Sequence, residues 1–272
     1  MALSSALSVI APQHDFNGRL FLVNRDNALS ENYVPELSAA KVKGQVRNMV
    51  PEAADALKEM FDACKKQTGV TLVSVSGYRS YGTQKNIYNR KLKNTKGNVD
   101  KANEYVAPPG ASEHQTGLAM DVGQQGKTNL SAGFANTKGG QWLRDHCHEY
   151  GFIIRYDEGW ENVTGYKYEP WHVRYVGKEN AALIHDAGVP FETWLAKYRA
   201  DTLLNLLSAG SDSSDTESSF DVSTNSDSDT RSDSEETSAS DNAENSEIPS
   251  TSDSSGSVEK QEISDKYPGE NK

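Results

Sequence analysis

The strongest constraint on the fold of this chain is the alternation of residue types between Leu118 and Val122. Ala119 and Asp121 separate the large apolar residues Leu118, Met120 and Val122, which is the period of a β-strand with one buried face. If the apolar side chains point into a core, Asp121 lies on the opposite face beside the small Ala119. A carboxylate held there is costly without a positively charged partner. The pattern therefore implies a cation beside Asp121, and a metal ion is one candidate.

A second stretch later in the chain has the same alternation. Trp171, Val173 and Tyr175 form the apolar side of this expected strand, which leaves His172 to face the other way with Arg174. The polar sides of the two expected strands thus carry the candidate functional side chains, while their apolar sides form part of a core.

The two stretches together offer two histidines and one carboxylate: His114, which precedes the first expected strand, Asp121 within that strand, and His172 in the second. This is a recurrent ligand set for catalytic zinc, which keeps three protein ligands and leaves a fourth position for water. Glu169, just upstream of His172, is then the natural general base. Strict alternation would place Glu169 on the wrong side of the strand. We therefore expect Pro170 to bend the chain where the strand begins.

Three segments occur in a characteristic order: Ser76-Gly77-Tyr78-Arg79-Ser80, Ser112-Glu113-His114-Gln115-Thr116-Gly117-Leu118-Ala119-Met120-Asp121 and Glu169-Pro170-Trp171-His172-Val173-Arg174-Tyr175. Together they resemble the zinc D-alanyl-D-alanine carboxypeptidases of the VanY type, over the region from residue 19 to residue 200. The resemblance implies a hedgehog/D-Ala-D-Ala peptidase fold. It also implies one zinc ion held by His114, Asp121 and His172, with Glu169 as the base.

The activity that this resemblance implies is removal of the C-terminal D-alanine from peptidoglycan stem peptides, in the cell envelope or outside the cell. An L,D-carboxypeptidase acting on tetrapeptide stems and a peptidoglycan endopeptidase would use the same chemistry and stay open. A zinc-stabilised module that binds the cell wall without turnover is the alternative from another class. The presence of Glu169 together with Arg79 argues against that module, because binding alone needs no general base.

Arg79, Gln84 and Ser112 are the candidates for contacts with the substrate. Arg79 stands between an expected strand, residues 70–75, and an expected helix that Ser80 can cap. Its planar guanidinium suits a carboxylate or a developing oxyanion there, although a surface ion pair is the common fate of an arginine. The resemblance adds Gln84 and Ser112 as hydrogen-bonding residues near the substrate.

Short strands interspersed with helices predict an α+β fold, with a small antiparallel sheet flanked by helices. The clearest helix begins at Pro51, a favourable first-turn position, and has an apolar stripe. The stripe consists of Ala53, Leu57, Met60, Phe61 and Cys64. Further strands are expected at residues 19–24 and 151–156, and further helices at residues 141–150, 179–187 and 190–207.

Charge and composition divide the chain at residue 208. Residues 208–272 hold 17 of the 39 acidic and 4 of the 28 basic residues, so residues 1–207 carry a net charge of only +2. The acidic part has almost no large apolar residues and cannot offset its ordering entropy, which predicts a disordered tail. This tail is either a solubilising segment or one with a wall-spanning or regulatory role. Residues 19–207 are expected to form the zinc carboxypeptidase domain.

Other classes of protein find little support. The first 18 residues lack the positive start of a secretory signal, which favours a flexible segment or the remnant of a removed signal. No run approaches the roughly 20 apolar residues that span a membrane. The nearly neutral domain offers no basic stripe for nucleic acid. The oligomeric state stays open, with a monomer expected.

The cysteines and the remaining histidines carry weaker signals. Cys64 and Cys147 are the only cysteines; they could pair in a secreted protein, but free thiols in the core are the more common outcome. His146 and His148 flank Cys147 and suggest a second metal site. Positions i and i+2 of a helix diverge, however, so a partly buried His146 is expected instead.

Overall fold

The computed structural model describes residues 18–211. Two predictions concern segments at the ends of the chain: a flexible or signal-derived start and a disordered acidic tail. Residues 1–17 and 212–272, which make up nearly all of these two segments, lie outside the described residues. The last described helix continues through Ser211, past the expected domain end at residue 207.

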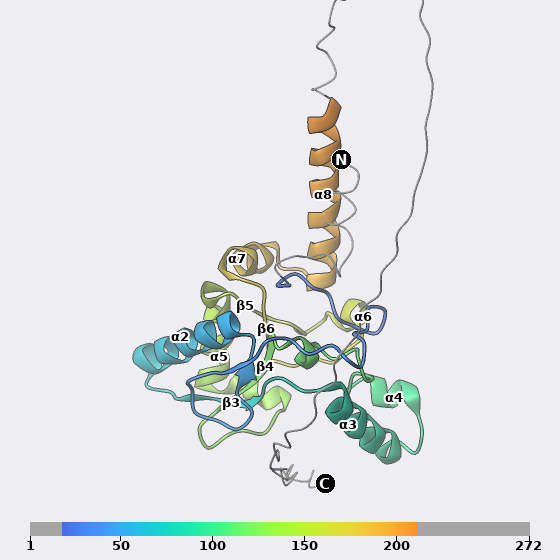
Figure 1. Cartoon of the computed structure of the whole chain (residues 1–272). Coiled ribbons are helices and arrows are strands. Elements are labelled where there is room, and N and C mark those ends of the chain that lie inside the picture. The colour runs from blue at the N-terminus through green and yellow to red at the C-terminus, as the bar shows by residue number, and fades with distance from the viewer. Residues whose placement is uncertain (1–17, 212–272) are drawn as a thin grey trace, which may run out of the picture. The chain divides into compact units, whose positions relative to one another are not determined.

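A four-stranded antiparallel sheet carries the fold (Figure 1), as the alternating segments predicted. Its strands, in spatial order, are β3 (Leu72–Ser76), β4 (Ala119–Gln124), β6 (His172–Tyr175) and β5 (Phe152–Ile154). β4 thus lies between β3 and β6, and Asp121 stands opposite His172 in the pairing of β4 with β6. A separate two-stranded ladder joins β1 (Ser38–Ala39) to β2 (Asn48–Met49).

Helices and 3-10 turns surround this sheet. The helices are α2 (Pro51–Thr68), α3 (Tyr81–Asn94), α4 (Val99–Asn103), α5 (Lys138–His146), α6 (Glu161–Thr164), α7 (Lys178–Ala187) and α8 (Phe191–Ser211). The 3-10 turns are η2 (Glu113–Thr116), η3 (Ala132–Asn136) and η4 (Cys147–Tyr150). The helix expected at residues 141–150 is therefore divided between α5 and η4.

The main core lies between the sheet, α2 and α5 (Figure 1). α2 begins at Pro51 and ends where Gly69 takes a left-handed conformation, and its predicted apolar stripe is buried. From the sheet, Met120, Val122 and Val173 enter the same core, as the alternation in both strands predicted. A second apolar cluster joins β5 to α7 and α8.

Residues 19–24 do not form the expected strand. The Arg174 guanidinium donates hydrogen bonds to the backbone carbonyls of Arg19 at 3.0 Å and Phe21 at 2.7 Å. The buried Arg174 side chain thus supplies hydrogen bonds to the backbone of this segment that a neighbouring strand would supply if the segment were part of a sheet. Only Val23 of this segment is buried, and the sequence pattern could not reveal Arg174 as its partner.

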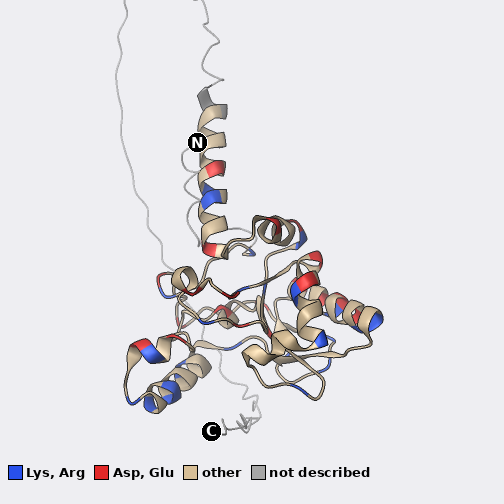
Figure 2. Ribbon diagram, turned by 180° about the vertical axis from the view of Figure 1, so that it is seen from behind, with Lys and Arg blue, Asp and Glu red and all other residues tan. Residues whose placement is uncertain are grey.

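Charges of both signs are interspersed over the described helices, as Figure 2 shows from behind.

Candidate metal centre

His114 reaches the polar side of the sheet from η2, directly before β4. Its side chain is 4 % exposed, and Nδ1 lies 2.8 Å from the Gly77 carbonyl oxygen. Because a carbonyl can only accept, Nδ1 carries the proton and Nε2 keeps its lone pair. Gly117 ends η2 with a φ of 72°, a conformation that favours glycine, and so turns the chain from His114 into β4.

Asp121 and His172 face each other from adjacent strands, and both are 4 % exposed. Asp121 Oδ1 lies 3.2 Å from His172 Nδ1, and Asp121 Oδ2 lies 3.4 Å from His114 Nε2. One potential ligand atom from each of the three residues lies within 4.8 Å of the others. Of all described His, Cys, Asp and Glu residues, only these three form a group that could hold a metal ion.

The electrostatics of the group fit a cation. Burial raises the pKa of Asp121, but His114 and His172 outweigh this effect and hold it well below its usual range. Burial lowers the pKa of His172, yet contacts with Asp121 and Glu113 raise it to about 9. The carboxylates therefore favour a positive charge at this point, which a divalent ion can supply. A mixed nitrogen and oxygen donor set of this kind suits zinc.

Glu169 lies beside this group because the chain bends where predicted. Pro170 and Trp171 form a turn, in which the His172 amide donates to the Glu169 carbonyl at 3.0 Å. β6 starts only after this turn, and Glu169 Oε2 lies 3.6 Å from His172 Nδ1. Burial raises the pKa of Glu169 to about 7, despite the opposing effect of His172. The carboxylate is thus able to accept a proton near neutral pH.

Arg79 approaches the group from the loop after β3. Its Nη2 lies 3.8 Å from Asp121 Oδ2 and 3.0 Å from Ser76 Oγ, and its Nη1 donates to Gln84 Oε1 at 2.7 Å. The predicted helix cap is present, since Ser80 Oγ accepts from the Thr83 amide at the start of α3. Arg79 is therefore held in place and is not a loose surface residue.

Gln84 and Ser112 are both buried, at 1 % and 5 % exposure. The Gln84 amide nitrogen donates to the Ala107 carbonyl at 2.6 Å, so Gln84 ties Arg79 to the loop before η2. Ser112 directly precedes η2. The structure brings Gln84 to the predicted site through Arg79, whereas direct contact of either residue with a substrate stays a prediction.

Sequence reasoning missed a buried ionic network behind His172. Glu113 Oε1 accepts hydrogen bonds of 2.8 Å from both Arg155 and Arg174, and Glu113 Oε2 lies 3.5 Å from His172 Nε2. Both arginines are fully buried. Burial raises the pKa of Glu113, but the two guanidinium groups hold it well below its usual range. Two arginines inside expected strands were the available signal, because a buried arginine needs a carboxylate.

A second metal site around His146 and His148 is not formed by the described residues. His146 Nδ1 contacts Glu149 at 2.8 Å, and the His146 ring packs on Trp142. His148 stacks on His185 with ring centroids 3.7 Å apart. The two side chains thus have separate partners, and His146 is partly buried as expected.

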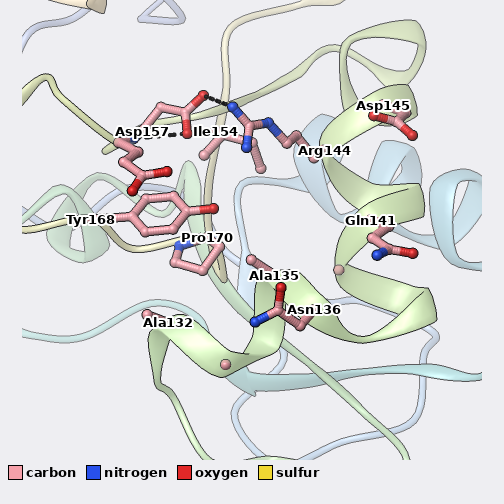
Figure 3. Close-up of a pocket in the computed structure, with 13 residues that line it drawn as sticks. Ala132, Ala135, Asn136, Gln141, Arg144, Asp145, Ile154, Asp157, Tyr168 and Pro170 are labelled. Carbon is pink, nitrogen blue, oxygen red and sulfur yellow. Dashed lines mark hydrogen bonds and ion pairs between the residues drawn. The ribbon is translucent and has the colours of Figure 1, made fainter.

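A pocket of about 650 Å³ opens beside η3 and α5 (Figure 3). Tyr168 and Pro170, which flank Glu169 in the sequence, line it on one side, and residues of η3 and α5 line it on the other. This volume is in the range of ligand pockets, roughly 300–1,000 Å³. None of the seven predicted site residues is among the residues that line it.

Two histidines and an aspartate around one point, with a glutamate of raised pKa and an oriented arginine beside them, are the arrangement expected of a mononuclear metallohydrolase. Comparison with known proteins gives the particular family. The family model VanY, described as D-alanyl-D-alanine carboxypeptidase, matches residues 46–178, a span that contains all seven predicted site residues. The chain belongs to this family.

Three relatives show how far the similarity extends. The putative carboxypeptidase YodJ of Bacillus subtilis (strain 168) is 46% identical over 188 residues, which cover 66% of this chain and 68% of YodJ. The solved structure of the LdcB LD-carboxypeptidase is 46% identical with a TM-score of 0.62, covering 66% of this chain and 88% of that one. A mutant of the vancomycin resistance D,D-pentapeptidase VanY in complex with Zn(II) is 32% identical with a TM-score of 0.56, covering 65% and 98%.

Proposed function

We propose that this protein is a zinc-dependent carboxypeptidase that removes the C-terminal D-alanine from peptidoglycan stem peptides. The observation that carries the proposal is the convergence of His114, Asp121 and His172 beside Glu169. The Zn(II) complex of the related VanY supports zinc as the metal. We assign this activity to the domain of residues 19–207, with α8 extending to Ser211.

His114 would bind zinc through Nε2 and His172 through Nδ1, because these are the nitrogens that face Asp121. Bound zinc lowers the pKa of a water molecule towards about 7 and polarises a carbonyl group. Glu169 would take the proton of the attacking water and deliver it to the leaving amine of D-alanine.

Arg79 would hold negative charge on the substrate, either its terminal carboxylate or the developing oxyanion. Gln84 and Ser76 fix its guanidinium, so little side-chain freedom remains to be lost on binding.

The relatives favour L,D-carboxypeptidase activity, on tetrapeptide stems, as the first assignment. LdcB, named as an LD-carboxypeptidase, shares 46% of aligned residues with this chain, whereas the D,D-pentapeptidase shares 32%. The D,D activity implied by the sequence motifs is the second candidate, supported by the description of the family model. Both activities need the same metal and base and differ in the residue that precedes the scissile bond.

A non-catalytic wall-binding module and an endopeptidase have less support. A module that only binds cell walls would need neither a glutamate 3.6 Å from a metal ligand nor an oriented arginine. An endopeptidase would act within a peptide, whereas Arg79 offers a counter-charge for a free terminal carboxylate.

We place the protein in the cell envelope because its proposed substrate is found there. Among the described residues, no helix is both long enough and apolar enough to cross a membrane.

The decisive experiment incubates purified protein with tetrapeptide and pentapeptide stems and follows release of D-alanine by mass spectrometry. Metal analysis of the same preparation should find one zinc ion per chain. Preferred trimming of the tetrapeptide would support the first assignment, and preferred trimming of the pentapeptide would support the second. A zinc-loaded protein that leaves both peptides intact would refute the proposed activity.

A further inference from the structure

Glu113 lies directly behind the candidate metal centre and is 1 % exposed. Its Oε1 atom is shared by Arg155 and Arg174, while Oε2 faces His172 Nε2 at 3.5 Å. Neither Oε2 nor this Nε2 makes a hydrogen bond with any residue that the structure describes. These two buried polar atoms thus face each other, and a slightly shorter distance between them would give both a hydrogen-bond partner.

This contact restricts the protonation of His172. An ionised carboxylate can only accept a hydrogen bond, so Glu113 favours the imidazole form with its proton on Nε2. The lone pair is then on Nδ1, the atom that faces Asp121 Oδ1 at 3.2 Å. We propose that Glu113 is a positioning residue that fixes the ring orientation and tautomer of His172 for metal binding.

The network around Glu113 can hold it in that position. Arg155 also donates two hydrogen bonds to Glu192 in the first turn of α8, one of them 2.9 Å long. Two carboxylates therefore pair with two guanidinium groups. Arg174 is anchored in turn by the backbone of the segment before β1. Partners of this kind typically change metal affinity about 10- to 100-fold when they are removed.

The inference rests on the proposed zinc site and extends it to a residue that would not touch the ion. The test compares Glu113→Gln with Glu192→Gln, which removes a charge from the same network without approaching His172. Zinc affinity, measured by competition with a chromophoric chelator, should fall about 10- to 100-fold in Glu113→Gln. It should stay at the wild-type value in Glu192→Gln. Thermal unfolding of both zinc-free variants reports how far each substitution disturbs the fold.

A second readout addresses the tautomer itself. Two-bond ¹H–¹⁵N NMR correlation of the zinc-loaded wild-type protein should show the His172 proton on Nε2. Should Glu113→Gln fail to fold, Glu113→Asp decides, because it keeps the charge between the arginines but moves the carboxylate away from His172. It should also lose zinc affinity.

The proposal is overturned if the folded Glu113 variant binds zinc as tightly as the wild type. It is overturned equally if Glu192→Gln loses as much affinity, or if the wild-type proton lies on Nδ1. A wild-type protein that binds no zinc would instead refute the metal site, which separates the two failures.

Discussion

Replacing Glu169 with glutamine should abolish most catalysis while leaving the fold and the metal site intact. The structural contacts of Glu169 are made by its backbone: its amide donates to the Tyr156 carbonyl at 2.8 Å, and its carbonyl accepts from the His172 amide at 3.0 Å. Glutamine preserves both contacts and the size of the side chain. We therefore expect no loss of stability, because burial disfavours the ionised carboxylate and the amide of glutamine carries no charge.

The catalytic loss can be bounded from the surroundings of Glu169. Loss of a general base typically lowers the rate about 10²- to 10⁴-fold, which corresponds to roughly 3–5 kcal/mol of transition-state stabilisation. Asp121 and Glu113 cannot replace the base, because their partners hold both pKa values below the usual range against the effect of burial. The loss should therefore lie in the upper part of that interval.

The assay follows release of D-alanine from the better stem peptide under steady-state conditions, with zinc content determined on the same samples. Glu161→Gln, the same chemical change at an exposed position in α6, is the matched control and should retain activity. Wild-type turnover in zinc-loaded Glu169→Gln would refute the role of Glu169 as base. Loss of zinc from this variant would show that the carboxylate acts on the metal site instead.

Three further outcomes are expected. Arg79→Lys keeps the charge but cannot reproduce the fork that Gln84 holds, so kcat/KM should fall; unchanged steady-state kinetics would contradict this. Leu57→Ala should lower the free energy of unfolding in urea by about 2–5 kcal/mol, because Leu57 is fully buried in α2. Leu204→Ala, at a position 63% exposed, should cost less than about 0.5 kcal/mol, and equal losses would argue against the described core. Burial raises the pKa of Cys147 to about 12, so this thiol should react with Ellman's reagent only after unfolding, and rapid reaction in the native protein would contradict its burial.

Local periodicity and turn chemistry were enough to predict much of the fold. The alternation around Asp121 predicted both β4 and its buried face correctly. This was possible because alternation with a period of two can be recognised within one segment, without knowing which strands pair with it. The apolar stripe after Pro51 predicted α2 in the same way, because helical spacing can also be recognised within one segment. Cys64 and Cys147 are free and buried in the same core, the outcome favoured by sequence.

Contacts between distant segments were beyond the reach of these patterns. Glu113 meets Arg155 and Arg174, which lie 42 and 61 positions further along the chain. No local pattern encodes such separations, so the carboxylate looked like an ordinary member of the motif. The prediction of a strand at residues 19–24 was wrong for the same reason. The donor that holds the backbone of this segment is Arg174, which lies far away in the sequence.

The direct pairing of Asp121 with His172 across β4 and β6 also limits how related chains can change in length. Deleting one residue inside either strand would bring Met120 or Val122 opposite the histidine and turn the apolar side chains outward. Insertions between the strands carry no such penalty, because exposed loops accommodate extra residues at little cost. Natural length variation should therefore concentrate around residues 125–131 and 157–165 and be absent from the two strands.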